Sequence, residues 1–116
     1  MFDMVFGREA SKEINFNEIF KLDHMLTEAH IPHELIERPG LGGYQVCYPV
    51  EQPELRICDA ILNVISYGHE DGLLEIMGLL TDEEYANDTV KGGLTAEDVF
   101  SRIKKDYESH YGTGKE

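Results

Sequence analysis

The amino-acid sequence predicts an α+β fold: an antiparallel sheet of three to five strands, arranged as a meander, with one helix before it and one after, packed on one face. Three observations predict this fold. A helical apolar pattern begins near residue 16, short β-prone runs fill residues 33–80, and a second helical pattern begins near residue 95. The 116 residues are expected to form one domain, 1–116, without a metal or disulfide to staple it.

The stretch over residues 56–80 is expected to organise the sheet. An Ile- and Val-rich arm and a Leu-rich arm flank the letters GHEDG, which favours a β-hairpin with its turn at residues 67–72. A symmetric closure places Ile61 opposite Leu79. The apolar spacing also leaves open a helix over residues 54–66. The face expected to form the core carries Cys58, Ala60, Leu62, Val64, Ser66, Leu74, Ile76, Gly78 and Leu80.

The other face of this hairpin is unusually apolar for a surface. Monomers seldom expose large contiguous apolar patches, so we expect either the N-terminal segment or a second copy of the chain, forming a homodimer, to cover it. Its apolar residues are Ile61, Ile65, Leu73, Met77 and Leu79.

The first half of the chain supplies a helix and two strands. Asn15 and Glu18 form a capping-box pattern, which predicts a helix over residues 16–29, and His30 stands where helices often turn left-handed. The runs HELIER and GGYQVCYP predict two strands on either side of the turn PGLGG.

Two further capping patterns follow the central stretch. Thr81 with Glu84 predicts a short helix ending near Asn87, and Thr95 with Asp98 predicts the start of the final helix. Residues 1–12 are expected to form an arm, and residues 112–116 a frayed tail.

The charge is the strongest compositional signal. The chain has 23 acidic and 10 basic residues, a net charge of −13, which argues against direct nucleic-acid binding and against anionic membranes. Residues 51–88 contain ten acids against one base, Arg56, so most of the negative charge belongs to the hairpin and its flanks. The sequence has no apolar run of membrane-spanning length and no secretory signal pattern, which predicts a cytoplasmic protein.

Residues that would support catalysis or a cofactor do not form a pattern. His30 and His33 lack a second pair of metal ligands, and Cys47 and Cys58 are expected to be buried free thiols. His69 with its two acidic neighbours fits a polar turn tip. We therefore expect no enzyme, no catalytic residue, no metal and no cofactor.

Several segments carry a resemblance to a known family. SYGHEDGLLEIMGLLTDEE and GGLTAEDVFSRI, preceded by AHIPHELIE and GGYQVCYP, resemble small uncharacterised proteins encoded in phages and prophages of Gram-positive bacteria. The similarity covers residues 16–107, with His30 in place of an expected glycine. It implies a phage or prophage setting in the cytoplasm of a bacterial host, and it carries over no functional residue.

Three functions remain open. The first is an inhibitor, such as an anti-defence protein of the anti-CRISPR kind, that binds a basic protein partner. The second is a binder of a small nucleotide ligand between Tyr44, Tyr48 and Tyr67, with Arg38 and Arg56 as phosphate donors. The third is a non-catalytic replication or assembly accessory. The expected partner contact consists of Tyr67, Glu70, Asp71, Glu75, Met77, Asp82, Glu83 and Glu84.

Overall fold

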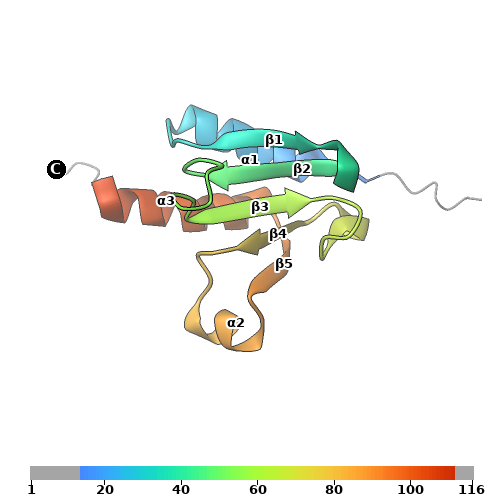
Figure 1. Ribbon diagram of the computed structural model, residues 1–116. Coiled ribbons are helices and arrows are strands. Elements are labelled where there is room, and N and C mark those ends of the chain that lie inside the picture. The colour runs from blue at the N-terminus through green and yellow to red at the C-terminus, as the bar shows by residue number, and fades with distance from the viewer. Residues whose placement is uncertain (1–13, 112–116) are drawn as a thin grey trace, which may run out of the picture.

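A computed structural model describes residues 14–111 and confirms the α+β class (Figure 1). Five antiparallel strands follow one another in the order β1-β2-β3-β4-β5, and the two long helices pack on one face of this sheet. The sequence expectations for the arm at 1–12 and the tail at 112–116 lie outside the described residues. The elements are α1 (Asn17–Glu28), β1 (Glu34–Arg38), the 3-10 helix η2 (Pro39–Leu41), β2 (Gly43–Tyr48), β3 (Cys58–Leu62), the 3-10 helix η3 (His69–Asp71), β4 (Leu74–Met77), α2 (Asp82–Asn87), β5 (Val90–Leu94) and α3 (Ala96–Tyr111).

The core lies between the sheet and the helices α1 and α3. Alternate residues of the inner strands point toward the helices, as the two-residue period of a strand requires. The phenol of Tyr48 is buried there and donates a hydrogen bond to Asp106 at 2.7 Å. Burial and that hydrogen bond raise the pKa of Tyr48. The fully buried core residues include Ile19, Leu22, Leu26, Val46, Leu62, Leu74, Ile76, Val99 and Ile103.

The central hairpin has the predicted faces but a different register. Ile61 pairs with Glu75, four residues away from its predicted partner Leu79. The strand ends earlier than expected because a local turn begins at Asn63. The Asn63 carboxamide accepts from the Ile65 N–H, and the Ser66 hydroxyl accepts from the Asn63 N–H.

An even shift in register does not exchange the faces of a strand. Cys58, Ala60 and Leu62 are therefore buried as predicted. Val64, which was also expected in the core, lies in the connection and is 54% exposed. The alternative helix over residues 54–66 is not formed, because Cys58–Leu62 is a strand paired on both sides.

The helix starts follow the predicted caps in two cases out of three. Thr81 with Glu84 forms a capping box on α2, and Thr95 with Asp98 exchanges the same pair of bonds at α3. At α1 the pattern is confirmed only in part: the Asn15 side chain accepts from the Asn17 N–H at 2.9 Å, but Glu18 does not bond back to the start of the helix. Its carboxylate instead accepts from the Ala96 N–H at 2.7 Å and caps α3.

Strand β5 has no counterpart among the elements predicted from the sequence. It contains two glycines and little apolar alternation, so its pairing with β4 is a tertiary effect. His30 has the expected left-handed backbone, with φ of 59°.

The first testable prediction concerns Gly43, at the start of β2. A Cβ on this residue would lie 2.0 Å from the Leu62 carbonyl oxygen. We expect Gly43→Ala to lower the free energy of unfolding by about 1–3 kcal/mol, measured by urea denaturation. Gly40→Ala is the control, because a Cβ there meets no atom within 4 Å. Equal stabilities of the two variants would contradict this account of Gly43.

Candidate functional site

The eight residues predicted to contact a partner fall into two groups. One group precedes or lies on β4: Tyr67 is 61% exposed, Met77 is 54% exposed, and Glu70 and Asp71 are exposed in η3. The other group lies on α2, which follows β4. The second group thus follows the end of β4 at which Met77 lies, whereas Tyr67, Glu70 and Asp71 precede the strand (Figure 1).

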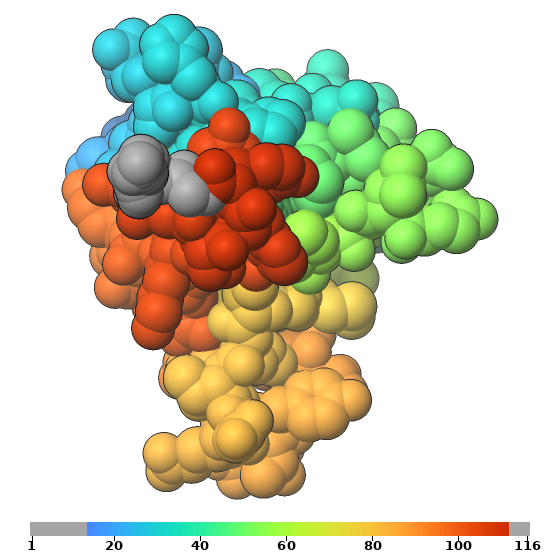
Figure 2. Space-filling model, turned by 90° about the vertical axis from the view of Figure 1, so that its left-hand side faces the viewer, coloured from blue at the N-terminus to red at the C-terminus, as the bar shows by residue number. Residues whose placement is uncertain are grey.

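The second group belongs to a segment that we call the acidic lobe, residues 78–89. Figure 2 shows this segment, coloured yellow to orange, extending away from the rest of the molecule. It contains no Lys, Arg or His, and its four acids give it a charge of −4. Asp82, Glu83 and Asp88 are exposed. Negative charge that no basic residue within the lobe itself balances therefore projects from the edge of the fold.

Arg102 of α3 fastens the acidic lobe to the body. Its two terminal nitrogens each donate to one oxygen of the Glu84 carboxylate at 2.7 Å, and one of them also donates to the Leu79 carbonyl at 3.0 Å. The Arg102 side chain is only 23% exposed. Such a paired, planar contact fixes direction as well as distance.

Glu84 is therefore an internal residue of the site, and the expectation that it lies exposed beside Asp82 and Glu83 is wrong. Its side chain is 20% exposed and also accepts from the Thr81 N–H within the capping box. The hydrogen bonds from Arg102, followed by that from Thr81, lower the pKa of Glu84 to about 2. Reversing this charge would disrupt the attachment of the lobe.

Glu75 likewise has an internal partner. Its carboxylate accepts from the Tyr67 N–H at 2.7 Å and holds the middle of the β3–β4 connection against β4. Two grooves flank the lobe, one between β4 and α2 and one beside Tyr67, and Glu70 and Asp71 line neither of them. Of the predicted acids, Asp82 and Glu83 are those that the lobe itself presents to solvent.

An open groove of about 430 Å³ lies between the end of β4 and α2. Met77 lies on one side of it, and Tyr85 on the other is 66% exposed. Sequence reasoning missed Tyr85, although an aromatic side chain within the polar run TDEEYANDT is the available signal. The groove is lined by Met77, Gly78, Leu79, Leu80, Tyr85 and Thr89.

A second groove, of about 360 Å³, brings Tyr67 to the other side of the lobe. Tyr67 lies so close to Gly92 of β5 that a Cβ on Gly92 would be 2.4 Å from the Tyr67 Cβ. Lys91 also lines this groove and supplies a positive charge beside it. Tyr67 is therefore the residue that connects the first predicted group to the lobe.

The apolar residues of the outer hairpin face, which was expected to be covered by another segment or chain, lie in several different elements. Leu79 has a left-handed backbone, with φ of 58°, and its side chain packs against the core. Ile65 is 71% exposed in the turn after β3, and Ile61 and Leu73 are half-buried. The five residues thus do not form one continuous sheet face, and the homodimer stays a prediction.

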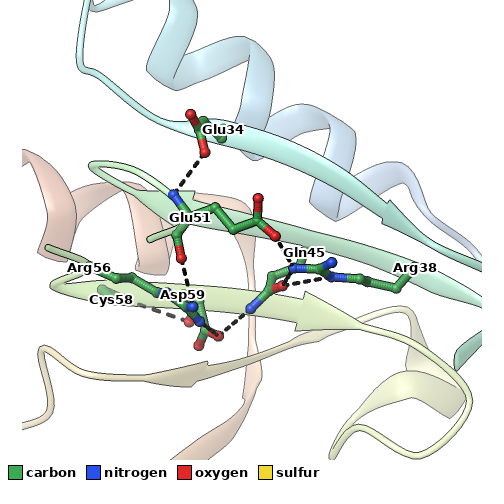
Figure 3. Close-up of polar contacts among 7 residues, drawn as sticks. All are labelled: Glu34, Arg38, Gln45, Glu51, Arg56, Cys58 and Asp59. Carbon is green, nitrogen blue, oxygen red and sulfur yellow. Dashed lines mark hydrogen bonds and ion pairs between the residues drawn. The ribbon is translucent and has the colours of Figure 1, made fainter. Parts of the chain in front are cut away.

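A polar network covers the sheet face away from the helices (Figure 3). Arg38 donates two hydrogen bonds to the Gln45 side chain, at 3.0 and 2.7 Å, and Gln45 donates to Asp59. Arg56 contacts Asp59 at 3.3 Å and the Glu51 carbonyl at 2.7 Å. The Glu51 carboxylate accepts from Arg38 at 2.8 Å. The segment between β2 and β3 is thereby held on the sheet.

The residues predicted to bind a nucleotide do not come together in one site. Both arginines expected to bind phosphate are engaged with internal acceptors. Tyr48 is buried in the core, and Tyr44 packs edge-on against Phe16 and Phe20. Tyr67 lies elsewhere, so the three tyrosines do not surround a common pocket.

The two cysteines are free and buried, as expected. Cys58 pairs with Tyr48 across the β2–β3 ladder, so Cys47 and Cys58 project from opposite faces of the sheet. Burial raises the pKa of Cys58 to about 12 and also raises that of Cys47. Neither thiol has the depressed pKa of a nucleophile.

His33, considered as a metal ligand together with His30, and His69 of the turn tip both have structural contacts. His33 lies 2.8 Å from both the Asp23 carboxylate and the Ile31 carbonyl, and His69 lies 2.6 Å from the Ser66 carbonyl. Within residues 14–111, no group of three or more His, Cys, Asp or Glu side chains is arranged to hold a metal ion.

Fold and site together describe a small α+β protein with a projecting acidic lobe. No family model, curated protein or solved structure matches the chain. In the described part of the chain, every helix is too short or too polar to cross a membrane.

The second prediction tests the attachment of the lobe. Arg102→Lys keeps the charge but removes the paired contact with Glu84. We expect the Tyr85 and Asp88 amides, which close the turns of α2, to exchange their hydrogens about tenfold faster. The Val99 amide in α3 should keep its rate. Uniform acceleration in both helices, or none in α2, would contradict a local role of Arg102.

The third prediction uses the low pKa of Glu84. Because this value lies below the ordinary 4.5, the interaction stabilises the fold above pH 4.5 and is lost as the pH falls toward 2. We expect the free energy of unfolding to be higher for the native chain than for Glu84→Gln near neutral pH. This difference should become smaller as the pH falls below 4.5. Glu83→Gln is the exposed control. A difference in the free energy of unfolding that does not change with pH would refute the stabilising role of the ionised Glu84.

Proposed function

We propose that this chain is a non-catalytic phage or prophage accessory protein, and that it acts in the cytoplasm of a bacterial host by binding a basic surface of another protein. An anti-defence inhibitor that occupies a nucleic-acid groove is the form of this function that we favour. One observation carries the proposal: the acidic lobe presents Asp82, Glu83 and Asp88 on a projection without a basic residue.

The charge supports this function through its placement. An evenly spread surface charge would maintain solubility equally well, whereas residues 51–88 hold ten acids and only Arg56. Arg56 is itself engaged with Asp59 and Glu51. A basic partner would sense the lobe from roughly a Debye length, about 8 Å at physiological salt, and association would be accelerated.

The internal attachment of the lobe supports it as well. Arg102 and the capping box hold α2 in place before any partner arrives. A preorganised contact loses less conformational freedom on binding than a flexible acidic tail. The lobe is thus suited to enter a groove as a rigid element.

The fourth prediction tests this function with charge reversal at the exposed acids. Tagged protein is purified from phage-infected or prophage-bearing cells, and the co-purifying protein is identified. We expect Asp82→Lys with Glu83→Lys to slow association with that partner by on the order of tenfold and to weaken its salt dependence. Glu84 is left intact, because its reversal would disturb the lobe.

The control reverses two exposed acids at the opposite edge of the molecule. Glu28→Lys with Glu37→Lys changes the net charge equally, but these residues lie on α1 and on β1, the sheet edge opposite β5. If the two double variants bound at the same rate and with the same salt dependence, the lobe would not be the contact and the proposal would fail.

A further inference from the structure

Two open grooves adjoin at the end of β4. One is the groove between β4 and α2 described above. The other, of about 250 Å³, lies beside the segment that leads into β3 and is bordered by Pro53, Ile57 and the ion pair of Arg56 with Asp59. Met77 and Gly78 line both of them. We call these two neighbouring grooves together the Met77 groove, which has Pro53 at one end, Met77 in the middle and Tyr85 at the other end.

The backbone at the end of β4 creates this groove. Gly78 has φ of 90°, and a Cβ on it would lie 2.2 Å from the Ile57 carbonyl oxygen. Leu79 follows with φ of 58°, an unfavourable value for a residue with a side chain. These two residues turn the chain out of the sheet and separate α2 from β4. Arg102 holds the Leu79 carbonyl and so maintains the turn.

Apolar side chains are exposed along the whole Met77 groove. Ile57 is 39% exposed, Met77 54% and Tyr85 66%. Methionine adapts its shape to a partner, and tyrosine is enriched among residues that dominate binding energy. Asp82 and Glu83 are exposed on α2, and Asp82 lies three residues before Tyr85, on the same side of the helix. The groove thus combines apolar anchoring sites with adjacent negative charge.

We propose that the Met77 groove seats a basic, amphipathic segment of the partner protein. Its apolar side chains lie along Ile57, Met77 and Tyr85, and its Lys or Arg side chains approach Asp82 and Glu83. This inference rests on the proposed function and specifies the chemistry of the partner. A second copy of the chain fits poorly, because it would bring another chain of net charge −13 against the lobe.

The test uses two synthetic peptides of equal positive charge. One is an 18-residue helical peptide of Leu and Lys with its leucines on one face, and the other has Ser in place of Leu. We expect the first peptide to shift the NMR signals of Ile57, Met77 and Tyr85, with an affinity that falls as salt increases. The second peptide should bind at least about tenfold more weakly. Equal binding of both, or shifts spread over all acidic surfaces, would overturn the proposal.

Variants within the chain complete the test. Met77→Ala with Tyr85→Ala should weaken the amphipathic peptide about tenfold or more. Ile65→Ala is the matched control, since Ile65 is 71% exposed but borders neither groove. Unchanged affinity in the double alanine variant would refute the groove. A native dimer that this variant converts to monomers would also refute it, because a second copy would then occupy the groove.

The outcomes for the groove and for the proposed function are separable. If the alanine variant keeps the cellular partner while Asp82→Lys with Glu83→Lys loses it, the acidic lobe remains the contact and the groove proposal fails. If the charge reversal leaves the partner bound with an unchanged rate, the proposed function fails, whatever the peptides do.

Discussion

The contact of Arg102 with Glu84 and Leu79 determines how the acidic lobe is attached to the rest of the fold. Both oxygens of one carboxylate and the carbonyl at the turn out of β4 accept from a single guanidinium. Without it, the six-residue helix α2 would be too short to persist, since isolated helices of that length are marginal in water. Helix α2 has no buried residue of its own, whereas Val99 and Ile103 anchor helix α3 in the core. Through Arg102, α3 therefore stabilises the lobe.

The same use of arginine on the open sheet face explains why the charge asymmetry survives folding. Arg38 and Arg56 donate hydrogen bonds to Gln45, Glu51 and Asp59. They therefore neutralise acids close to them and contribute little to the electrostatic field at a distance. Of the acids of the lobe, Glu84 is paired with Arg102, whereas Asp82, Glu83 and Asp88 are exposed. Folding therefore sorts the carboxylates into those that hold the chain together and those that project.

The sequence predicted those features of the fold that depend on neighbouring residues. The capping pair Thr81 and Glu84 and the alternation through Ala60 act locally, and both were predicted correctly. The register failed because Asn63 forms a turn with Ser66, which competes with continued pairing. Strand β5 and the bond from Ala96 to Glu18 depend on segments far apart in the chain, and no local pattern indicates them.

The candidate site shows the same division between local and distant causes. Acidic composition identified Asp82 and Glu83, but it gave Glu84 the same role, because the partner of Glu84 lies eighteen residues further along the chain. Periodicity placed Met77 on the outer face of β4, yet only the left-handed turn at Gly78 and Leu79 opens a groove beside it. A docking surface of this kind results from a bend between two elements. Gly78 and Arg102 therefore create the groove through the backbone bend, whereas the side chains of Ile57, Met77 and Tyr85 would supply the apolar contacts with a partner.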